Sequence, residues 1–484
     1  MDHPSFKPPV YRISSVITDQ FLQKLLLGAV ALGVVMDGID GSIVNVALPT
    51  IASYFSTDTG TIAWVIITYM LMMAGLLLVF GKLAERGRAK MLFLAGFAVF
   101  TIGSAACGFA PTLDILLAAR VLQGIGAAMI AAVAPLLCIH YLPKEMLGTA
   151  LGVIAATASI GYAAGPAIGG IITQHFSWHW IFLINIPIGI AGILFAARVI
   201  PGDDPDQRAV SFDYLGALTL FGSMVFWIFA LDEMPARGAT DTLILACMAL
   251  GLICVGLFIV RELTTPEPFL NIRIFASWRF SAVLTVYLLI NVIFAGILYL
   301  LPFYLANGMH FNHMTSGLYL LVPSAIIAIA SVPVGKWSDR TGRRRPFAVF
   351  ACILVVFYSA VFTVISPESG IVPLLAGLIL MGTAFGIASA PASIRIIEMA
   401  PLGEKDTGSS LMVTAIYFGS VLGTAVYASI FTFATMNAGT VVDFADLSSG
   451  AFLSGFHVTI AAGLILSVLS VMLSAIVPDA EKAD

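Results

Sequence analysis

Charged side chains are scarce in this 484-residue sequence, at 10% of the total, whereas soluble domains carry roughly 25%. Hydrophobic residues make up 60% of the chain, and its mean hydropathy is +1.01. A soluble globular core has no room for so much apolar surface. The composition therefore excludes an ordinary soluble fold and predicts a chain that folds in a lipid bilayer.

The sequence also lacks the patterns of several other function classes. A net charge of -4 leaves no basic surface for nucleic acid, and the five cysteines are scattered without the paired spacing of a disulfide framework or zinc site. An HExxH pair, a nucleophile elbow and a phosphate-cradling Gly-Lys-Ser/Thr loop are all missing from the sequence. We therefore expect no enzyme, no metal, no cofactor and no nucleic-acid partner.

Long apolar stretches of about 20 residues, the length that spans a bilayer, are abundant instead. Polar or Gly/Pro-rich turns separate them. They predict an all-α membrane protein with fourteen transmembrane helices, at residues 25–47, 61–80, 91–110, 114–137, 148–172, 180–200, 213–231, 242–260, 280–303, 315–334, 347–366, 371–393, 409–432 and 455–477.

The positions of Lys and Arg predict how the chain is oriented. Short loops rich in these residues stay on the cytoplasmic side. With the N-terminus inside, all of the 23 Lys and Arg residues fall in cytoplasmic segments except Arg237, which lies outside, and Arg120, which lies within a span. We expect a multi-pass protein of a bacterial or archaeal cell (inner) membrane with both termini cytoplasmic. The first apolar run is too long for a signal peptide and is expected to be retained.

An internal repeat divides the chain. Residues 81–86 (GKLAER) follow the second span, and residues 335–340 (GKWSDR) follow the tenth, as expected of a transporter built from two halves. The halves are predicted at 25–200 and 280–477, each with six helices. Residues 201–279 then hold two linkers and an extra helix pair that is not expected to line the central site, and residues 1–24 and 478–484 form cytoplasmic segments.

Arg120 stands inside the fourth span, where a lone charge is costly unless an acid pairs with it. The first span supplies two acids, Asp37 and Asp40, spaced three residues apart and therefore on one helix face. Helix rise places Asp40 and Arg120 at compatible depths. We predict that they pair. The pair is either a functional coupling site or a structural lock between the first and fourth spans.

Together these motifs resemble the major facilitator superfamily, and specifically its fourteen-helix drug antiporter branch. The resemblance covers nearly the whole chain in the expected order. Residues 40–49 resemble the drug antiporter segment of span one, and Glu85 departs from the family pattern by replacing the usual Asp. The other residues that match family motifs are Gly81, Arg86, Gly335, Asp339 and Arg340 in the repeated loops, Arg120, Gln123 and Gly124 in span four, and Gly161, Gly165, Pro166 and Gly169 in span five.

The resemblance implies the major facilitator fold and alternating access between the two halves. It implies a secondary active exporter of amphipathic drugs or toxic compounds, driven by protons moving inward, with Asp40 as the first candidate carrier and Asp37 as the second. Two carboxylates this close titrate as a coupled pair. The repeated loops would hold the cytoplasmic side closed, and the span-five glycines with Pro166 would form a pliable seam between the halves.

The substrate pocket is the least defined part of the sequence. Asn291, Phe303, Tyr304 and Tyr417 are candidates to line a central cavity, with helix packing as the alternative role. We expect a monomer. Three alternatives stay open: a dedicated exporter of a single endogenous metabolite or antibiotic, a non-transporting sensor on the same scaffold, and sodium in place of the proton.

Overall fold

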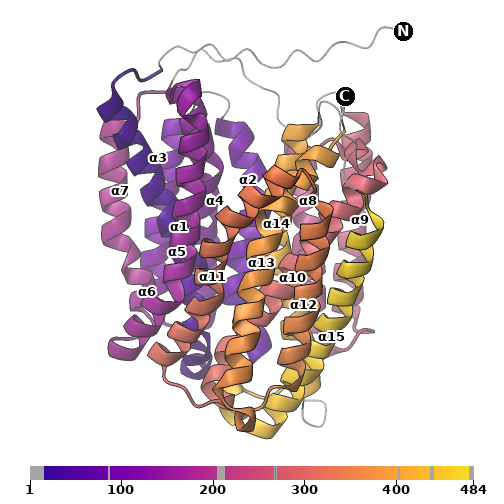
Figure 1. Ribbon diagram of the computed structural model, residues 1–484. Coiled ribbons are helices and arrows are strands. Elements are labelled where there is room, and N and C mark those ends of the chain that lie inside the picture. Colours follow the sequence, from indigo (N-terminus) through magenta and orange to yellow (C-terminus); the bar gives the residue numbers. More distant parts are fainter. Residues whose placement is uncertain are drawn as a thin grey trace.

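The structure is a computed structural model that describes residues 16–84, 88–203, 213–265, 268, 270–401, 404–436 and 441–478 (Figure 1). These residues are organised almost entirely into helices. The α-helices are α1 (Gln20–Phe55), α2 (Thr59–Ala84), α3 (Ala89–Gly108), α4 (Leu113–Tyr141), α5 (Leu147–His175), α6 (Trp180–Leu183), α7 (Asn185–Val199), α8 (Tyr214–Arg237), α9 (Thr242–Thr264), α10 (Trp278–Phe303), α11 (His313–Thr341), α12 (Arg345–Val364), α13 (Ile371–Met399), α14 (Lys405–Thr435) and α15 (Ser449–Ile476).

Fourteen of the described helical segments are long and apolar enough to cross a membrane, with α6 and α7 sharing one of them. The predicted all-α membrane fold with fourteen spans is therefore confirmed. Helix α1 begins and helix α15 ends at the same end of the molecule (Figure 1), as an even number of spans requires. We call this end the terminal end and the opposite end the far end.

Most helices extend beyond the bounds predicted from hydropathy, and two of these differences have a clear local cause. Helix α1 begins at Gln20, because the Asp19 carboxylate accepts the Phe21 amide at 2.8 Å and caps the first turn. Helix α8 runs to Arg237 and not to residue 231, since an ion pair of 2.6 Å between Glu233 and Arg237 stabilises its last turn. The correction to α8 matters because it places a further acid, Asp232, inside the helix.

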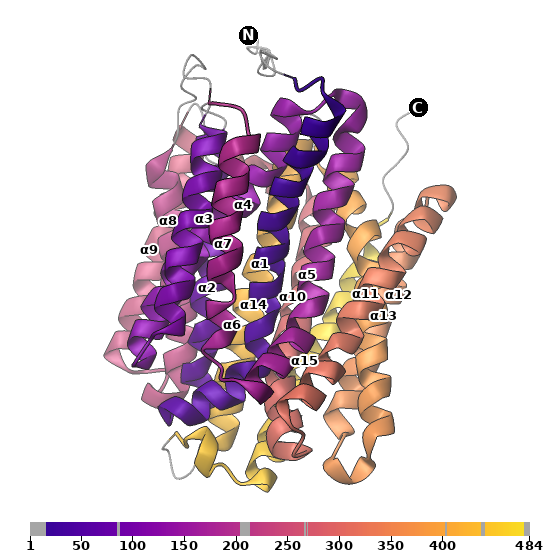
Figure 2. The same cartoon turned by 90° about the vertical axis from the view of Figure 1, so that its left-hand side faces the viewer.

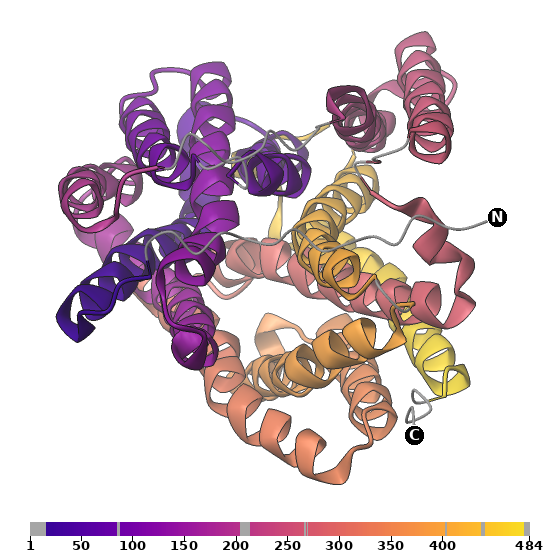
Figure 3. The same ribbon diagram turned by 90° about the horizontal axis from the view of Figure 1, so that it is seen from above.

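Helices α1–α7 and α10–α15 form two bundles, and the pair α8–α9 lies at the edge of the molecule beside α2 and α14 (Figure 3). Helix α8 makes the contact with both bundles, since the Phe221 ring fills the space over Gly75 of α2 and the Ser429 hydroxyl of α14 donates to the Leu231 carbonyl at 2.7 Å. Helix α9 exposes a row of leucine, isoleucine and valine side chains, as expected of a lipid-facing helix.

The two bundles meet at the far end. There the Tyr299 hydroxyl of α10 donates to the carbonyl of Thr59 at the start of α2. The amide of Phe444, in the short 3₁₀ helix η5 (Phe444–Asp446), donates to the Thr57 carbonyl at 3.2 Å. These bonds, each accepted by a backbone carbonyl of the first half, hold the two halves of the chain together at the far end.

Helices α5 and α11 are close together toward the far end and spread apart toward the terminal end (Figure 2). At the contact, a Cβ atom added to Gly317 of α11 would come within 2.3 Å of the Pro166 carbonyl of α5. About four turns nearer the terminal end on the same face of α5, a Cβ atom at Gly152 would meet no atom within 4 Å. The seam between the halves is thus tight at one end and open at the other.

Candidate functional site

The carboxylate of Asp40 is the centre of a buried polar cluster. Helix α1 carries it at a fully buried position, where its Oδ2 accepts Arg120 Nη1 at 2.7 Å. Its Oδ1 accepts Gln123 Nε2 at 2.8 Å and Asn185 Nδ2 at 2.9 Å. The predicted pairing of Asp40 with Arg120 is therefore confirmed. Three donors on one carboxylate stabilise its ionised form and fix its orientation.

The guanidinium of Arg120 is held on several sides. Its Nε donates to the Val65 carbonyl at 2.8 Å, and its Nη1 also donates to Gln123 Oε1 at 2.6 Å. The Tyr69 ring lies 4.2 Å from the guanidinium carbon, and the Phe182 ring lies 5.7 Å from it. A buried cation is tolerated when an anion and further acceptors surround it in this way, and the aromatic faces add a cation–π attraction.

Gln123 and Asn185 position the ion pair. Gln123 lies one turn after Arg120 in α4, so both side chains leave the same helix face, and its Nε2 donates additionally to Ser104 Oγ at 2.8 Å. Asn185 stands at the break between α6 and α7. Pro187 contributes to that break because it has no amide hydrogen with which to bond the Leu183 carbonyl one turn earlier. Sequence reasoning found Gln123 and missed Asn185 and Ser104.

Asp37 lies one turn before Asp40 but in a different environment. Its side chain is half-buried, and its Oδ1 accepts the Tyr69 hydroxyl at 2.6 Å. Tyr69 also covers Arg120, so a continuous set of contacts runs from Asp37 through Tyr69 and Arg120 to Asp40. In the described part of this cluster, Arg120 is the one cation beside two carboxylates, and it forms an ion pair with Asp40, whereas Asp37 reaches it only through Tyr69. Ionisation of both leaves an excess negative charge within the span, which a low-dielectric surrounding disfavours.

The glycines of α5 bring this helix against α1 beside the acids. A Cβ atom at Gly165 would lie 2.0 Å from Ser42 Oγ, and Gly161 and Gly169 approach α1 at Val35 and Ile43 in the same manner. Helix α5 presents Pro166 to α11. Because glycine lets helix backbones approach closely, α5 is packed between the helix that carries the acids and the opposite half of the molecule.

The other residues singled out from the sequence are distributed more widely. Asn291 is buried and donates to the Tyr287 carbonyl of its own helix at 2.8 Å. Phe303 and Tyr304 are buried in aromatic contacts with η5 and α15 near the far end. Tyr417 of α14 is half-buried and lies within electrostatic reach of Asp37. Tyr417 is thus a candidate pocket residue that interacts electrostatically with the acidic cluster.

The repeated loops lie at the terminal end. Gly81, at the start of the first repeated loop, faces open space. Gly124 belongs instead to the motif in α4, where it packs against the Tyr69 backbone of α2. Gly335 and Arg340 lie in the last turns of α11. Shortly after this helix ends, Arg344 forms an ion pair of 3.6 Å with Glu398 of α13. Two predicted residues of the first loop and one side chain of the second fall outside the described residues, namely Glu85, Arg86 and the side chain of Asp339.

An unpredicted contact joins α3 and α7 at the terminal end. The Asp203 carboxylate accepts the amides of Lys90 and Met91 at 2.8 and 2.9 Å, at the start of α3. In return, Lys90 Nζ donates to the Ile200 carbonyl at 2.6 Å, at the end of α7. An acid at a helix start and a cation at a helix end both complement the helix dipoles, so this reciprocal cap fixes the terminal end of the first half.

Comparisons with known proteins agree with this fold. The chain is 30% identical over 410 residues to the riboflavin transporter RibZ of Clostridioides difficile, covering 84% of this chain and 88% of RibZ. It is 28% identical to a multidrug resistance protein B homologue of Mycobacterium tuberculosis, covering 84% and 76%. It is 31% identical to the putative multidrug resistance protein MdtD of Pectobacterium atrosepticum, covering 83% and 85%.

Among solved structures, a bacterial homologue of the human lysosomal transporter Spinster superposes with a TM-score of 0.66 at 15% identity, covering 94% of this chain and 97% of the homologue. The nucleoside transporter NupG superposes with the same TM-score at 11% identity, covering 93% and 99%. Both similarities concern the fold. A model of the Major Facilitator Superfamily matches residues 30–424, and the chain, a membrane transporter and not an enzyme, belongs to this family.

Proposed function

We propose that the protein is a proton-coupled exporter of amphipathic drugs or toxic compounds, and that it acts as a monomer by alternating access in the cell (inner) membrane. The observation that carries the proposal is the cluster in which the ion pair of Asp40 with Arg120 is joined to a second acid, Asp37, through Tyr69. One proton on the two carboxylates balances the charge of the cluster, whereas none leaves it negative. A span that holds such an imbalance has a physical reason to bind and release a proton.

Asp37 and Asp40 have different roles in this proposal. Asp37 is half-buried and has one hydrogen-bond donor, so it is the carboxylate that a proton from the central site reaches first. Asp40 is fully buried and holds Arg120 together with Gln123 and Asn185. Protonation of the pair weakens the hold of α1 on α4. Because α5 packs on α1 through Gly165, a change in α1 is passed to the seam with the second half.

The lysine and arginine distribution supports a cytoplasmic location for both termini. With this orientation, the closed far end faces outward and the open seam between α5 and α11 faces the cytoplasm. The structure then corresponds to an inward-facing state that admits substrate from inside the cell. A substrate drives the switch only if its affinity differs between the inward-facing and outward-facing states.

Two of the relatives compared above are named for multidrug resistance, which supports a broad range of amphipathic substrates. The similarity to RibZ favours a second candidate function, the transport of a single metabolite of flavin-like chemistry. The two functions share the fold and the acidic cluster. A screen of transported compounds separates them.

The test is transport of a lipophilic cationic dye in proteoliposomes under an imposed pH gradient. We expect the native chain to move the dye against its gradient, and expect Asp37→Asn and Asp40→Asn each to abolish this uphill transport. Asp114→Asn serves as a matched control. Asp114 is exposed at the start of α4, so its substitution removes one negative charge outside the cluster. Uphill transport that persists in both cluster variants would refute proton coupling through these acids.

A further inference from the structure

A second buried acid lies at the far end of the molecule, on the extra helix α8 between the two bundles. Asp232 belongs to α8, which packs against α2 of the first half and α14 of the second half (Figure 3). Its Oδ2 accepts the indole N–H of Trp64 in α2. The carbonyl of the preceding residue, Leu231, accepts the Ser429 hydroxyl of α14 at 2.7 Å. Asp232 therefore lies where α8 holds the two halves together.

One oxygen of Asp232 is unsatisfied. Its Oδ1 is fully enclosed, and the described residues give it no hydrogen-bond donor. The neighbouring acids have partners of their own, since Asp58 caps the start of α2 and Glu233 pairs with Arg237 at 2.6 Å. An enclosed oxygen that bears charge and lacks a donor is costly. A proton on Oδ1 removes that cost.

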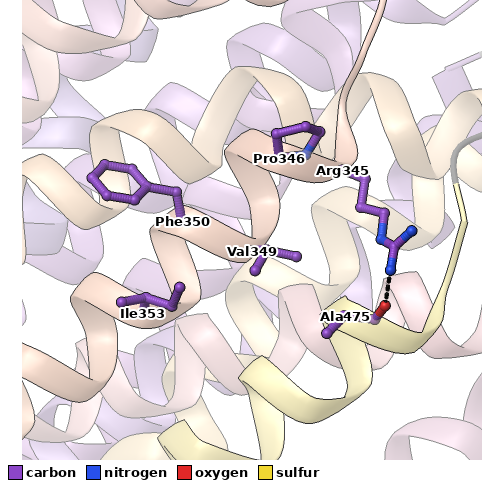
Figure 4. Close-up of a pocket in the computed structure, with 6 residues that line it drawn as sticks. All are labelled: Arg345, Pro346, Val349, Phe350, Ile353 and Ala475. Carbon is purple, nitrogen blue, oxygen red and sulfur yellow. Dashed lines mark hydrogen bonds between the residues drawn. The ribbon is translucent and has the colours of Figure 1, made fainter.

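The far end also supplies little positive charge. At the terminal end, basic side chains bond the carbonyls of helix ends, as Arg345 of α12 does with Ala475 of α15 beside a surface groove (Figure 4). Toward the far end, Arg237 is the only lysine or arginine that the described residues place outside the central cluster. Because Arg237 pairs with Glu233, it does not balance the charge of Asp232.

The groups that face Asp232 are acidic or neutral. Asp58, before α2, and Glu233, on α8 itself, lie within electrostatic reach of it, as does Tyr299 of α10. Asp241 stands at the start of α9, and the last two turns of α14 contain no charged side chain. Histidine is absent from α2, α8, α9 and α14. Like charges disfavour one another's ionised forms, so these surroundings oppose a second negative charge beside Glu233.

We propose that Asp232 is a proton-binding site of a gate at the far end. Closure of this end binds one proton on Asp232 Oδ1, taken from the water on that side, and opening returns it to the same water. Opening separates α8 from its neighbours and hydrates the carboxylate, which stabilises the charged form. The closed state then holds one proton more than the open state, so acidity favours closure.

This proton is not transported and is separate from the protons of the central cluster. Only the side that the gate faces rests on the proposed function. With the far end outward, acid outside the cell promotes the return to the inward-facing state after the substrate has left. The gate therefore responds to the same outside acidity that would drive transport.

Spin labels on the far ends of α2 and α10 measure the ratio of open to closed molecules in the intact, purified protein. Between about pH 6 and about pH 8 we expect this ratio to rise with pH, by at most about tenfold per pH unit for one proton. Asp232→Asn cannot bind the proton, so its ratio should be independent of pH. A native ratio that does not change with pH would overturn the proposal, as would a pH dependence that survives in Asp232→Asn.

Glu233→Gln removes a negative charge next to the site. It should keep the pH dependence but move its midpoint to lower pH, and an unchanged midpoint would contradict a proton on Asp232 even if Asp232→Asn fails to fold. Asp241→Asn is the matched control, because it removes the same charge at the same end, from the start of α9. Its ratio should follow that of the native chain at every pH.

Asp37→Asn distinguishes this site from the central cluster. The proposed function expects this variant to lose uphill transport, whereas its spin-label distances should keep the native pH dependence. The two proposals can therefore fail independently. Loss of the pH dependence in Asp37→Asn would assign the proton to the central cluster and overturn the role of Asp232.

Discussion

At the scale of single residues, the site is defined by an imbalance of charge. Asp40 receives donors from three side chains, whereas Asp37 receives one hydroxyl donor from Tyr69. Arg120 is oriented entirely by acceptors of the first half. Because this half folds around the ion pair, Asp40 and Arg120 have a structural role in addition to any role in coupling, and the two roles can be measured separately.

Removal of one partner of this ion pair leaves a buried, unpaired charge. We therefore expect Asp40→Asn and Arg120→Gln each to lower the stability of the purified protein by about 3–5 kcal/mol. The double variant removes both charges and should lose less than the sum of the two single losses. Thermal unfolding in detergent measures the three values. Additive losses would show that the two side chains do not depend on each other in the folded protein.

The sequence predicted the ion pair because a lone arginine in a span requires an acid at its depth, and span one offers acids at the matching depth. It did not predict Asn185, whose position depends on the helix break between α6 and α7 and on how α7 packs against α1. Hydropathy could not reveal Asp232 as part of a helix either, because the apolar run stops before it. Local patterns identify charges, whereas their neutral partners depend on tertiary packing.

At the scale of elements, α5 is the connection between the acidic cluster and the second half. Its glycine face touches α1, and its Pro166 touches α11. We expect Gly165→Val to force α5 away from α1 at a cost of about 1–3 kcal/mol and to abolish transport while the protein still inserts. The control is Gly152→Val in the same helix, where the added side chain meets open space. Transport by Gly165→Val at the native rate would exclude α5 as the connection.

Helix α8 joins both halves at the far end through two consecutive residues. The Leu231 carbonyl accepts the Ser429 hydroxyl of the second half, and the Asp232 carboxylate accepts the indole N–H of Trp64 in the first half. The extra helix pair was predicted to lie outside the central site. Helix α8 of this pair contacts both α2 of the first half and α14 of the second half. In the proposed inward-facing state these bonds would add to the closure of the far end.

Trp64→Phe removes the indole donor but keeps an aromatic ring. Since a hydrogen bond to a charged group contributes about 1.5–3 kcal/mol, we expect the population of far-end-open molecules to rise by at least about tenfold. Spin labels on the far ends of α2 and α10 report this opening as a longer distance. Trp278→Phe is the control, because Trp278 is exposed at the terminal end of α10. An equal distance distribution in both variants would count against a closing role for α8.

At the scale of the whole molecule, the number of spans and the common side of the two termini followed from hydropathy and from the placement of Lys and Arg. Both properties follow from the composition of each segment alone, without knowledge of how the segments pack. The sequence could not indicate which end of the molecule is closed, because the same helices pack against each other in either state of a rocking transporter. That information comes from contacts between the halves, such as those of Tyr299 with Thr59 and of Pro166 with Gly317.

Closure of the far end can be trapped by a cross-link between the halves. The Thr50 hydroxyl of α1 lies 3.4 Å from the His313 ring nitrogen of α11, so cysteines at these two positions, in a chain without its five native cysteines, should be joined by a short bis-methanethiosulfonate reagent that spans the space of the lost ring and forms a reducible disulfide with each thiol. We expect the cross-linked protein to bind dye from the cytoplasmic side but to transport none, because α1 and α11 must separate for the far end to open. Reduction should restore transport. Full transport by the cross-linked protein would mean that the halves do not part along α1 and α11, and alternating access by rocking about this seam would have to be abandoned.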